Sequence, residues 1–185
     1  KFPVNSVSDF KGKKLRIYST ATQQMGSMLG FNATILPFAE IPQAFSTGLI
    51  EALFTSPQTG IDIQAWDNTK HFTYAGAIFS KNAVVVTKKA FNALSKGDQS
   101  NMLAAAKKAE LRGWEMSAET TKKQIGILKK NGMSSKNAPD EVISKMKSIG
   151  LEMMKNWRSK ASPEANAVLD RYLSCLLYTS DAADE

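Results

Sequence analysis

The sequence has little of the chemistry that metal sites and many enzymes depend on. Its 185 residues include one cysteine, Cys175, and one histidine, His71. A single cysteine excludes a disulfide within the chain and leaves the redox compartment open. A lone histidine, without a second histidine, a cysteine or clustered acids, is no signal of a metal site. We therefore expect no metal and no cofactor.

Long apolar runs and glycine-rich motifs are missing as well. No segment approaches the roughly 20 apolar residues that a membrane helix needs, so we expect a protein that is not membrane-embedded. No nucleophile elbow, phosphate loop, dinucleotide fingerprint or zinc motif is present. Hydrophobic residues make up 43% of the chain and charged residues 22%, which is typical of a globular protein with one domain or a large part of two.

The net charge of the chain is +7, and a basic balance can indicate binding to nucleic acid. The lysines are dispersed, however, and many occur as pairs on predicted helices, which is typical of solvated faces. No RNA-binding signature or helix-turn-helix pattern accompanies them. We therefore expect no nucleic-acid partner.

The most informative stretch is residues 11–56, where strand and helix signals alternate. The expected elements, in order, are a strand at Lys14–Tyr18, a short helix ending at Gly30, an apolar run at Ala33–Leu36, a helix at Ala39–Gly48 and a strand at Ile50–Thr55. Short connections between them predict a parallel sheet with right-handed crossovers. Such sheets bind ligands beyond the carboxyl ends of their strands, where Tyr18–Thr20, Pro37–Phe38 and Thr55–Pro57 are expected to converge.

Arg16 lies near the end of the first of these strands. Its guanidinium stays charged and presents a planar fork that can hold a carboxylate with two parallel hydrogen bonds. The backbone amides at the start of the following helix would reinforce anion binding. The alternative is an arginine on a polar strand face that is solvated or paired with a nearby acid such as Asp9.

Three sequence blocks carry a resemblance to a known family. FKGKKLR, LPFAEIPQAFSTGLIEA and KNAVVVTKKAFNALS resemble the solute-binding proteins of tripartite ATP-independent periplasmic (TRAP) transporters, of the dicarboxylate-binding type, in matching order from about Pro3 to about Leu173. The resemblance implies an α/β fold of the periplasmic-binding-protein kind (class II type). Residues 1–88 would form the second ligand-binding lobe with hinge-crossing strands. Residues 89–173 would supply a long spanning helix and C-terminal helices, and the first lobe would be largely missing.

The same resemblance implies roles for particular residues. Arg16 would bind the substrate carboxylate, Phe38 would lie against the ligand, and Thr55 would line the site with Ser56 beside it. Thr55 stands where asparagine is common in the family, which leaves the identity of the ligand open.

Two more residues are candidates for the site. Trp66, in an expected short helix at Gln64–Asn68, either approaches the cleft or is a core or lobe-interface aromatic. Asn82 begins an expected strand, Asn82–Thr87, whose run Ala83–Val86 is typical of a strand buried on both faces. In the family this strand runs back between the lobes, which would bring Asn82 to the ligand.

The second half of the chain is predominantly helical. A long helix is expected at about 98–131, with an apolar stripe that includes Leu103 and Trp114 and that we assign to core packing alone. Further helices are expected from Pro139 and from Pro163. Residues 174–185 break the helical pattern and are interpreted as a non-native tail, similar to translated sequencing-adapter read-through.

Three functions from different classes remain open. The first is the periplasmic solute-binding component of a TRAP transporter, which captures a small organic acid and delivers it to membrane permease subunits. Since members of that family are exported and no signal peptide is present, the sequence is interpreted as truncated. The second is an α/β enzyme acting on a carboxylate-containing molecule, with Glu40 and Glu51 as the nearest acid–base candidates. The third is a basic, helix-covered interaction module.

Overall fold

The computed structural model describes residues 1–78 and 83–181, and their side chains except for Ala118 and residues 176–181. The strands are β1 Lys14–Ile17, β2 Asn32–Ile35, β3 Ala52–Leu53, β4 His71–Tyr74 and β5 Ser134–Asn137. The helices are α1 Thr20–Met28, α2 Ile41–Ser46, α3 Pro57–Asp62, α4 Lys88–Asn92, α5 Lys96–Lys130, α6 Asp140–Arg158 and α7 Pro163–Asp181, with 3-10 turns η1 Val7–Phe10, η2 Phe38–Glu40 and η3 Ala65–Asp67.

The predicted parallel sheet is confirmed. β1 lies between β2 and β3 and pairs with both in parallel, with Leu15 opposite Ala33 on one side and Ala52 on the other. β4 and β5 form a second, two-stranded parallel sheet. The expected polar face of the first strand is wrong, because Leu15, Arg16 and Ile17 are all buried.

The sequence explains how α1 is seated on this sheet. The hydroxyl of Ser19 accepts a hydrogen bond from the N–H of Thr22, and the hydroxyl of Thr22 accepts one from the N–H of Ser19, which forms a capping box. Gly26 faces β1 so closely that an added Cβ would lie 3.0 Å from a methyl group of Leu15. A larger residue at position 26 would therefore require Leu15 of β1 and Ala33 of β2 to shift by a few tenths of an ångström.

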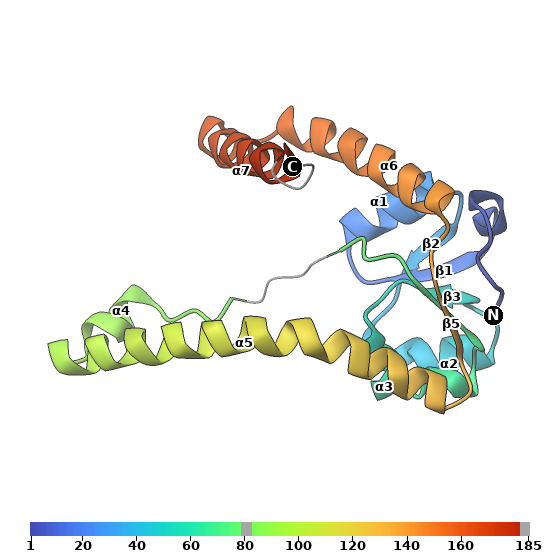
Figure 1. Ribbon diagram of the computed structural model, residues 1–185, viewed down its shortest axis with the longest axis horizontal. Coiled ribbons are helices and arrows are strands. Elements are labelled where there is room, and N and C mark those ends of the chain that lie inside the picture. The colour runs from blue at the N-terminus through green and yellow to red at the C-terminus, as the bar shows by residue number, and fades with distance from the viewer. Residues whose placement is uncertain (79–82, 182–185) are drawn as a thin grey trace.

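Three small apolar clusters form the core. The first joins η1, α1 and α6, and its buried members are Phe10, Leu29, Ala138, Val142, Met146 and Ile149. The second surrounds α2, with Ile41, Ala44, Phe45 and Ile50 buried. The third anchors the end of α5, with Ala65, Leu128 and Met133 buried. Beyond this anchored end, α5 extends away from the sheets together with α4, and α6 and α7 form a second arm that leaves the sheets toward the same side of the view, above α5 (Figure 1).

Three sequence-based expectations about the chain beyond β4 are corrected. The stripe on α5 is not simple core packing, because Leu103 and Trp114 are exposed and Leu128 is the buried member of the described part of the helix. Residues 83–87 are not in a strand, and Val84 and Val85 are exposed, since no described strand pairs with them. The helical pattern does not break at residue 174, because α7 continues to Asp181.

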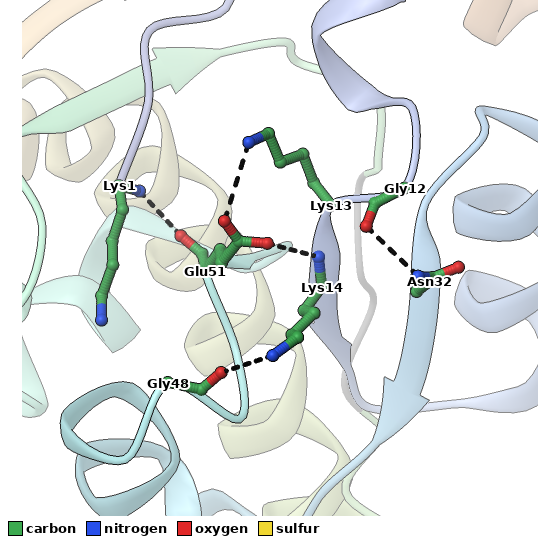
Figure 2. A network of polar contacts seen from close by, with 7 residues as sticks. All are labelled: Lys1, Gly12, Lys13, Lys14, Asn32, Gly48 and Glu51. Carbon is green, nitrogen blue, oxygen red and sulfur yellow. Dashed lines mark hydrogen bonds and ion pairs between the residues drawn. The ribbon is translucent and has the colours of Figure 1, made fainter.

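A polar network ties the strands together at their amino ends (Figure 2). The Glu51 carboxylate accepts a hydrogen bond from the backbone N–H of Lys14 at 3.1 Å and lies 3.7 Å from the ammonium of Lys13. The Lys14 ammonium donates to the carbonyl of Gly48, and the Asn32 amide donates to the carbonyl of Gly12. These bonds fix β1 against β2 and β3 at the edge opposite their carboxyl ends.

The Glu51 network predicts a pH-dependent contribution to stability. The Lys14 N–H, and then the nearby lysines, lower the pKa of Glu51 below its usual value. A depressed carboxyl pKa stabilises the fold above the unfolded-state pKa, and this contribution disappears as the pH falls through the folded-state pKa. Glu51→Gln should therefore lower the urea midpoint of unfolding at pH 7, and the difference from the wild type should shrink towards pH 3.

The matched control for this experiment is Glu152→Gln, because Glu152 is exposed on α6 and belongs to none of the ion pairs among the described residues. It should leave the midpoint almost unchanged at both pH values. A Glu51→Gln difference as large at pH 3 as at pH 7 would show that the carboxylate charge is not the cause.

Candidate functional site

A cavity of about 780 Å³ brings together the three loops that the sequence predicts to converge. Tyr18 follows β1, Phe38 follows β2, and Thr55 and Ser56 follow β3, and all four line this cavity. The opposite wall comes from β4 and from α5. The site therefore lies where parallel α/β sheets usually bind ligands, at the carboxyl ends of adjacent strands.

Arg16 reaches this cavity from the middle strand. The residue is only 5% exposed, and its Nε donates a hydrogen bond to the carbonyl of Leu36 at 3.1 Å. None of the ion pairs among the described residues includes Arg16. Burial lowers the pKa of the guanidinium, and Tyr18 opposes that shift. The structure thus holds a largely desolvated cation at the cavity wall without an acidic partner.

The alternative pairing of Arg16 with Asp9 is wrong. The Asp9 carboxylate instead accepts hydrogen bonds from the backbone N–H groups of Asn5 and Ser6, at 2.7 and 2.9 Å. These bonds are the first causes of a lowered pKa for Asp9. Asp9 therefore has a capping role at η1 and does not neutralise Arg16.

The start of α1 adds hydrogen-bond donors close to Arg16 in sequence. The N–H groups of Thr22 and Gln23 donate to Ser19, whereas those of Thr20 and Ala21 have no acceptor within the helix. The positive end of the helix dipole favours an anion at such a terminus. Thr22, which is buried, lines the cavity beside this turn.

The candidate acid–base residues are not at the cavity. No aspartate or glutamate is among the described residues that line it, whereas Arg16 and Lys1 are. Glu51 is held in the network at the far edge of the sheet. Glu40 is exposed at the position before α2 and makes no capping hydrogen bond.

The other predicted site residues have different outcomes. Phe38 is 51% exposed at the cavity, and the hydroxyl of Ser56 also accepts the N–H of Thr59, so it caps α3. Trp66 is not among the lining residues and packs, partly buried, against the cluster of Ala65, Leu128 and Met133. Asn82 lies outside the described residues.

The contribution of α5 to the cavity was not expected from the sequence. Trp114, Ser117 and Thr121 line the cavity, and their spacing of three and four residues places them on one face of the helix. A tryptophan that shares a helical face with two hydroxyl residues is an available signal in the sequence. This signal did not lead to a site prediction, because Trp114 also fits the apolar stripe that was assigned to core packing.

A family model matches most of the chain. Residues 1–160 match DctP, described as bacterial extracellular solute-binding protein, family 7. Among the described residues, no helix combines the length and apolarity needed to cross a membrane.

Several solved structures are similar to the chain. DctP7 of Bordetella pertussis, an extracytoplasmic solute receptor binding pyroglutamic acid, is 38% identical with a TM-score of 0.83; the match covers 93% of this chain and 57% of that one. DctP6 of the same organism, also described as binding pyroglutamic acid, is 36% identical with a TM-score of 0.84, covering 91% and 56%. A TRAP solute-binding protein from Fusobacterium nucleatum, with bound sn-glycerol-3-phosphate, is 18% identical with a TM-score of 0.82, covering 100% and 58%, and shows the fold alone. The chain thus spans little more than half the length of these proteins.

The environment of Arg16 predicts that replacing this buried residue will not destabilise the protein. Arg16→Met keeps the length of the side chain and removes a buried charge that has no acidic partner, at the cost of one hydrogen bond. The free energy of unfolding of the ligand-free protein should therefore stay within about 1 kcal/mol of the wild type or rise. Chemical denaturation measures it. A loss of more than about 2 kcal/mol would instead mark Arg16 as a structural residue.

Proposed function

The chain belongs to the DctP family of bacterial extracellular solute-binding proteins, and on that premise we propose that it captures a small organic anion by its carboxylate. The observation that carries this proposal is the buried guanidinium of Arg16 at a cavity whose described lining residues include no aspartate or glutamate. A carboxylate that meets this fork would supply the missing counter-charge and accept two charge-assisted hydrogen bonds. The free amides of the first turn of α1 would favour the same charge.

The other predicted residues complete the proposed contact surface. Phe38 offers an apolar ring at the cavity mouth, and Thr55 and Ser56 offer hydroxyl groups on the neighbouring loop. Trp114, Ser117 and Thr121 of α5 supply a second wall with an aromatic ring and two more hydroxyls. This mixture suits a ligand with one carboxylate and a small, partly polar body.

Pyroglutamate is the first ligand to test. Two structures that are 38% and 36% identical to this chain are described as receptors binding pyroglutamic acid, and a marine metagenome protein at 29% identity is described with co-purified pyroglutamate. Pyroglutamate carries a single carboxylate on a small lactam ring, which agrees with one guanidinium among hydroxyl and aromatic groups.

The transport role extends the proposal to a longer parent protein. In it, these residues would form one lobe of a two-lobed receptor that closes on the ligand by a hinge motion, with α5 as the element shared by both lobes. The parent would act in the periplasm and deliver its ligand to TRAP membrane permease subunits. The supporting facts are the family assignment and the length of the similar structures, of which this chain covers 57% and 56%.

Turnover of the ligand has no support at this site. The family to which the chain belongs is one of solute-binding proteins, not of enzymes. The two glutamates considered for acid–base chemistry, Glu40 and Glu51, are absent from the described lining of the cavity.

The proposal predicts that the shape of the cation matters as well as its charge. Arg16→Lys replaces a planar fork by a point charge, and it should weaken pyroglutamate binding by the parent protein at least about tenfold in isothermal titration calorimetry. Arg112→Lys is the matched control, because Arg112 is exposed on α5 and does not line the cavity. Equal affinities for the wild type and Arg16→Lys would remove Arg16 from the site.

Under the proposal, the lobe that this chain lacks contributes to ligand affinity, so the 185-residue chain and its longer parent should differ in affinity. This 185-residue chain should bind the same ligand much more weakly than its parent, because one wall of the cleft would be missing and the ligand would stay partly solvated. Calorimetry on both proteins measures the ratio. Affinities of equal strength would show that a single lobe is sufficient for capture.

A further inference from the structure

Charged residues are distributed unevenly around the cavity. Arg16 and Lys1 are its arginine and lysine, and no carboxylate side chain is among the described residues that line it. The side-chain ammonium of Lys1 donates to the carbonyl of Phe45. Arg16 donates through Nε to the carbonyl of Leu36, and its other guanidinium N–H groups make no hydrogen bond among the described residues. The polar remainder consists largely of hydroxyl groups, including those of Tyr18, Thr22 and Thr55.

Several acidic residues lie within two positions of a lining residue, but none of them is among the described residues that line the cavity. Glu40 is exposed before α2, Asp67 ends η3, and Glu115 and Glu119 lie on α5. Asp9 caps η1, and Glu51 belongs to the network at the amino ends of the strands. Asp62 accepts a hydrogen bond from the side chain of Gln58 on α3. Residues 79–82, which are outside the described part of the chain, have the sequence Phe-Ser-Lys-Asn and contain no acid. The described residues that line the cavity therefore place no carboxylate beside Arg16.

This distribution has a consequence for ligands that carry a positive charge. In an α-amino acid the ammonium is attached to the carbon next to the carboxylate, so a carboxylate held by Arg16 would bring the ammonium close to the guanidinium. The two like charges would repel each other where burial weakens screening by water. The ammonium would also lose hydration without gaining an acidic partner. A neutral N–H, hydroxyl or carbonyl group has neither penalty and can bond to the surrounding hydroxyls.

Resting on the proposed function, we infer that this site selects organic acids without an ammonium group and rejects zwitterionic amino acids of the same size and shape. The substrate class is then carboxylates whose body is neutral, such as lactam, hydroxy or carbocyclic acids. The selection comes from the charges on this chain's part of the site, where no described lining residue places a carboxylate beside Arg16, and not from the shape of the cavity.

Three ring acids of nearly equal size test the inference on the parent protein by calorimetry at pH 7. Cyclopentanecarboxylate and L-pyroglutamate have neutral rings, and L-proline has an ammonium in the same five-membered ring. Proline should bind at least about tenfold more weakly than the tighter of the two neutral acids. Proline affinity within about threefold of that acid, or tighter, overturns the inference.

A charge variant tests the cause directly. Thr55→Asp places a carboxylate on the cavity wall in a side chain of similar size. It should narrow the ratio between proline and the neutral acid by about tenfold or more, because the ammonium gains a partner. Thr47→Asp is the matched control, since Thr47 is exposed after α2 and does not line the cavity. Thermal unfolding of both variants verifies that they fold, and an unchanged ratio in folded Thr55→Asp contradicts the inference.

Failure of this inference differs from failure of the proposed function. If neither neutral ring acid binds, a panel of other carboxylates is screened, and any that binds is compared with its α-amino derivative under the same tenfold criterion. If no organic acid in the panel binds, both the proposed function and the inference fail. If neutral acids and their ammonium analogues bind equally, anion capture stands and charge selection fails alone.

Discussion

The structure depends on a parallel sheet whose middle strand carries a buried guanidinium. Desolvating a cation without a counter-charge is unfavourable, and protein interiors tolerate it chiefly where another requirement outweighs stability. Arg16 occupies this situation on β1, with one hydrogen bond from Nε and no ion pair to any described acidic residue. The cost is tolerable because the surrounding fold is held together by contacts that do not involve Arg16, in three separate apolar clusters.

The two ends of the same sheet show opposite electrostatic arrangements. At the amino ends, Glu51 faces Lys13 and the N–H of Lys14, so positive and negative groups are matched. At the carboxyl ends, Arg16 and the first turn of α1 present positive charge and free N–H groups with no matching acid among the lining residues. Where opposite charges are paired, they fix the positions of the strands. Where positive charge is unpaired, an anion from outside would gain the most favourable interaction energy. The division follows from strand direction alone, because parallel strands place all their amino ends at one edge.

The sequence predicted those parts of the fold that local pattern determines. Alternating strand and helix signals in residues 11–56 predicted the parallel sheet, and Gly30 marked the end of α1 to within two residues. Arg16 and the loops that carry Phe38 and Thr55 were predicted because strand order places them at one edge. The burial of Arg16 was not predicted, since alternation on a four-residue strand cannot reveal that both faces are covered. Trp66 was left open for a similar reason, because an aromatic in a short helix fits a core and a cleft equally well.

The failures beyond β4 have a common cause in long-range packing. An apolar stripe predicts that a helix face is buried, but it does not identify the residues that pack against it. On α5, Leu128 is buried whereas Leu103 and Trp114 are exposed. Trp114, Ser117 and Thr121 meet the cavity only because α5 is anchored beside α3, more than fifty positions earlier in the chain. The valines at 84–86 show the same limit, since an apolar run implies a partner strand without containing it. The cavity therefore combines a locally encoded guanidinium with a wall set by tertiary contacts. Under the proposed function, the charge preference would come from the first part and the fit to a particular ligand largely from the second.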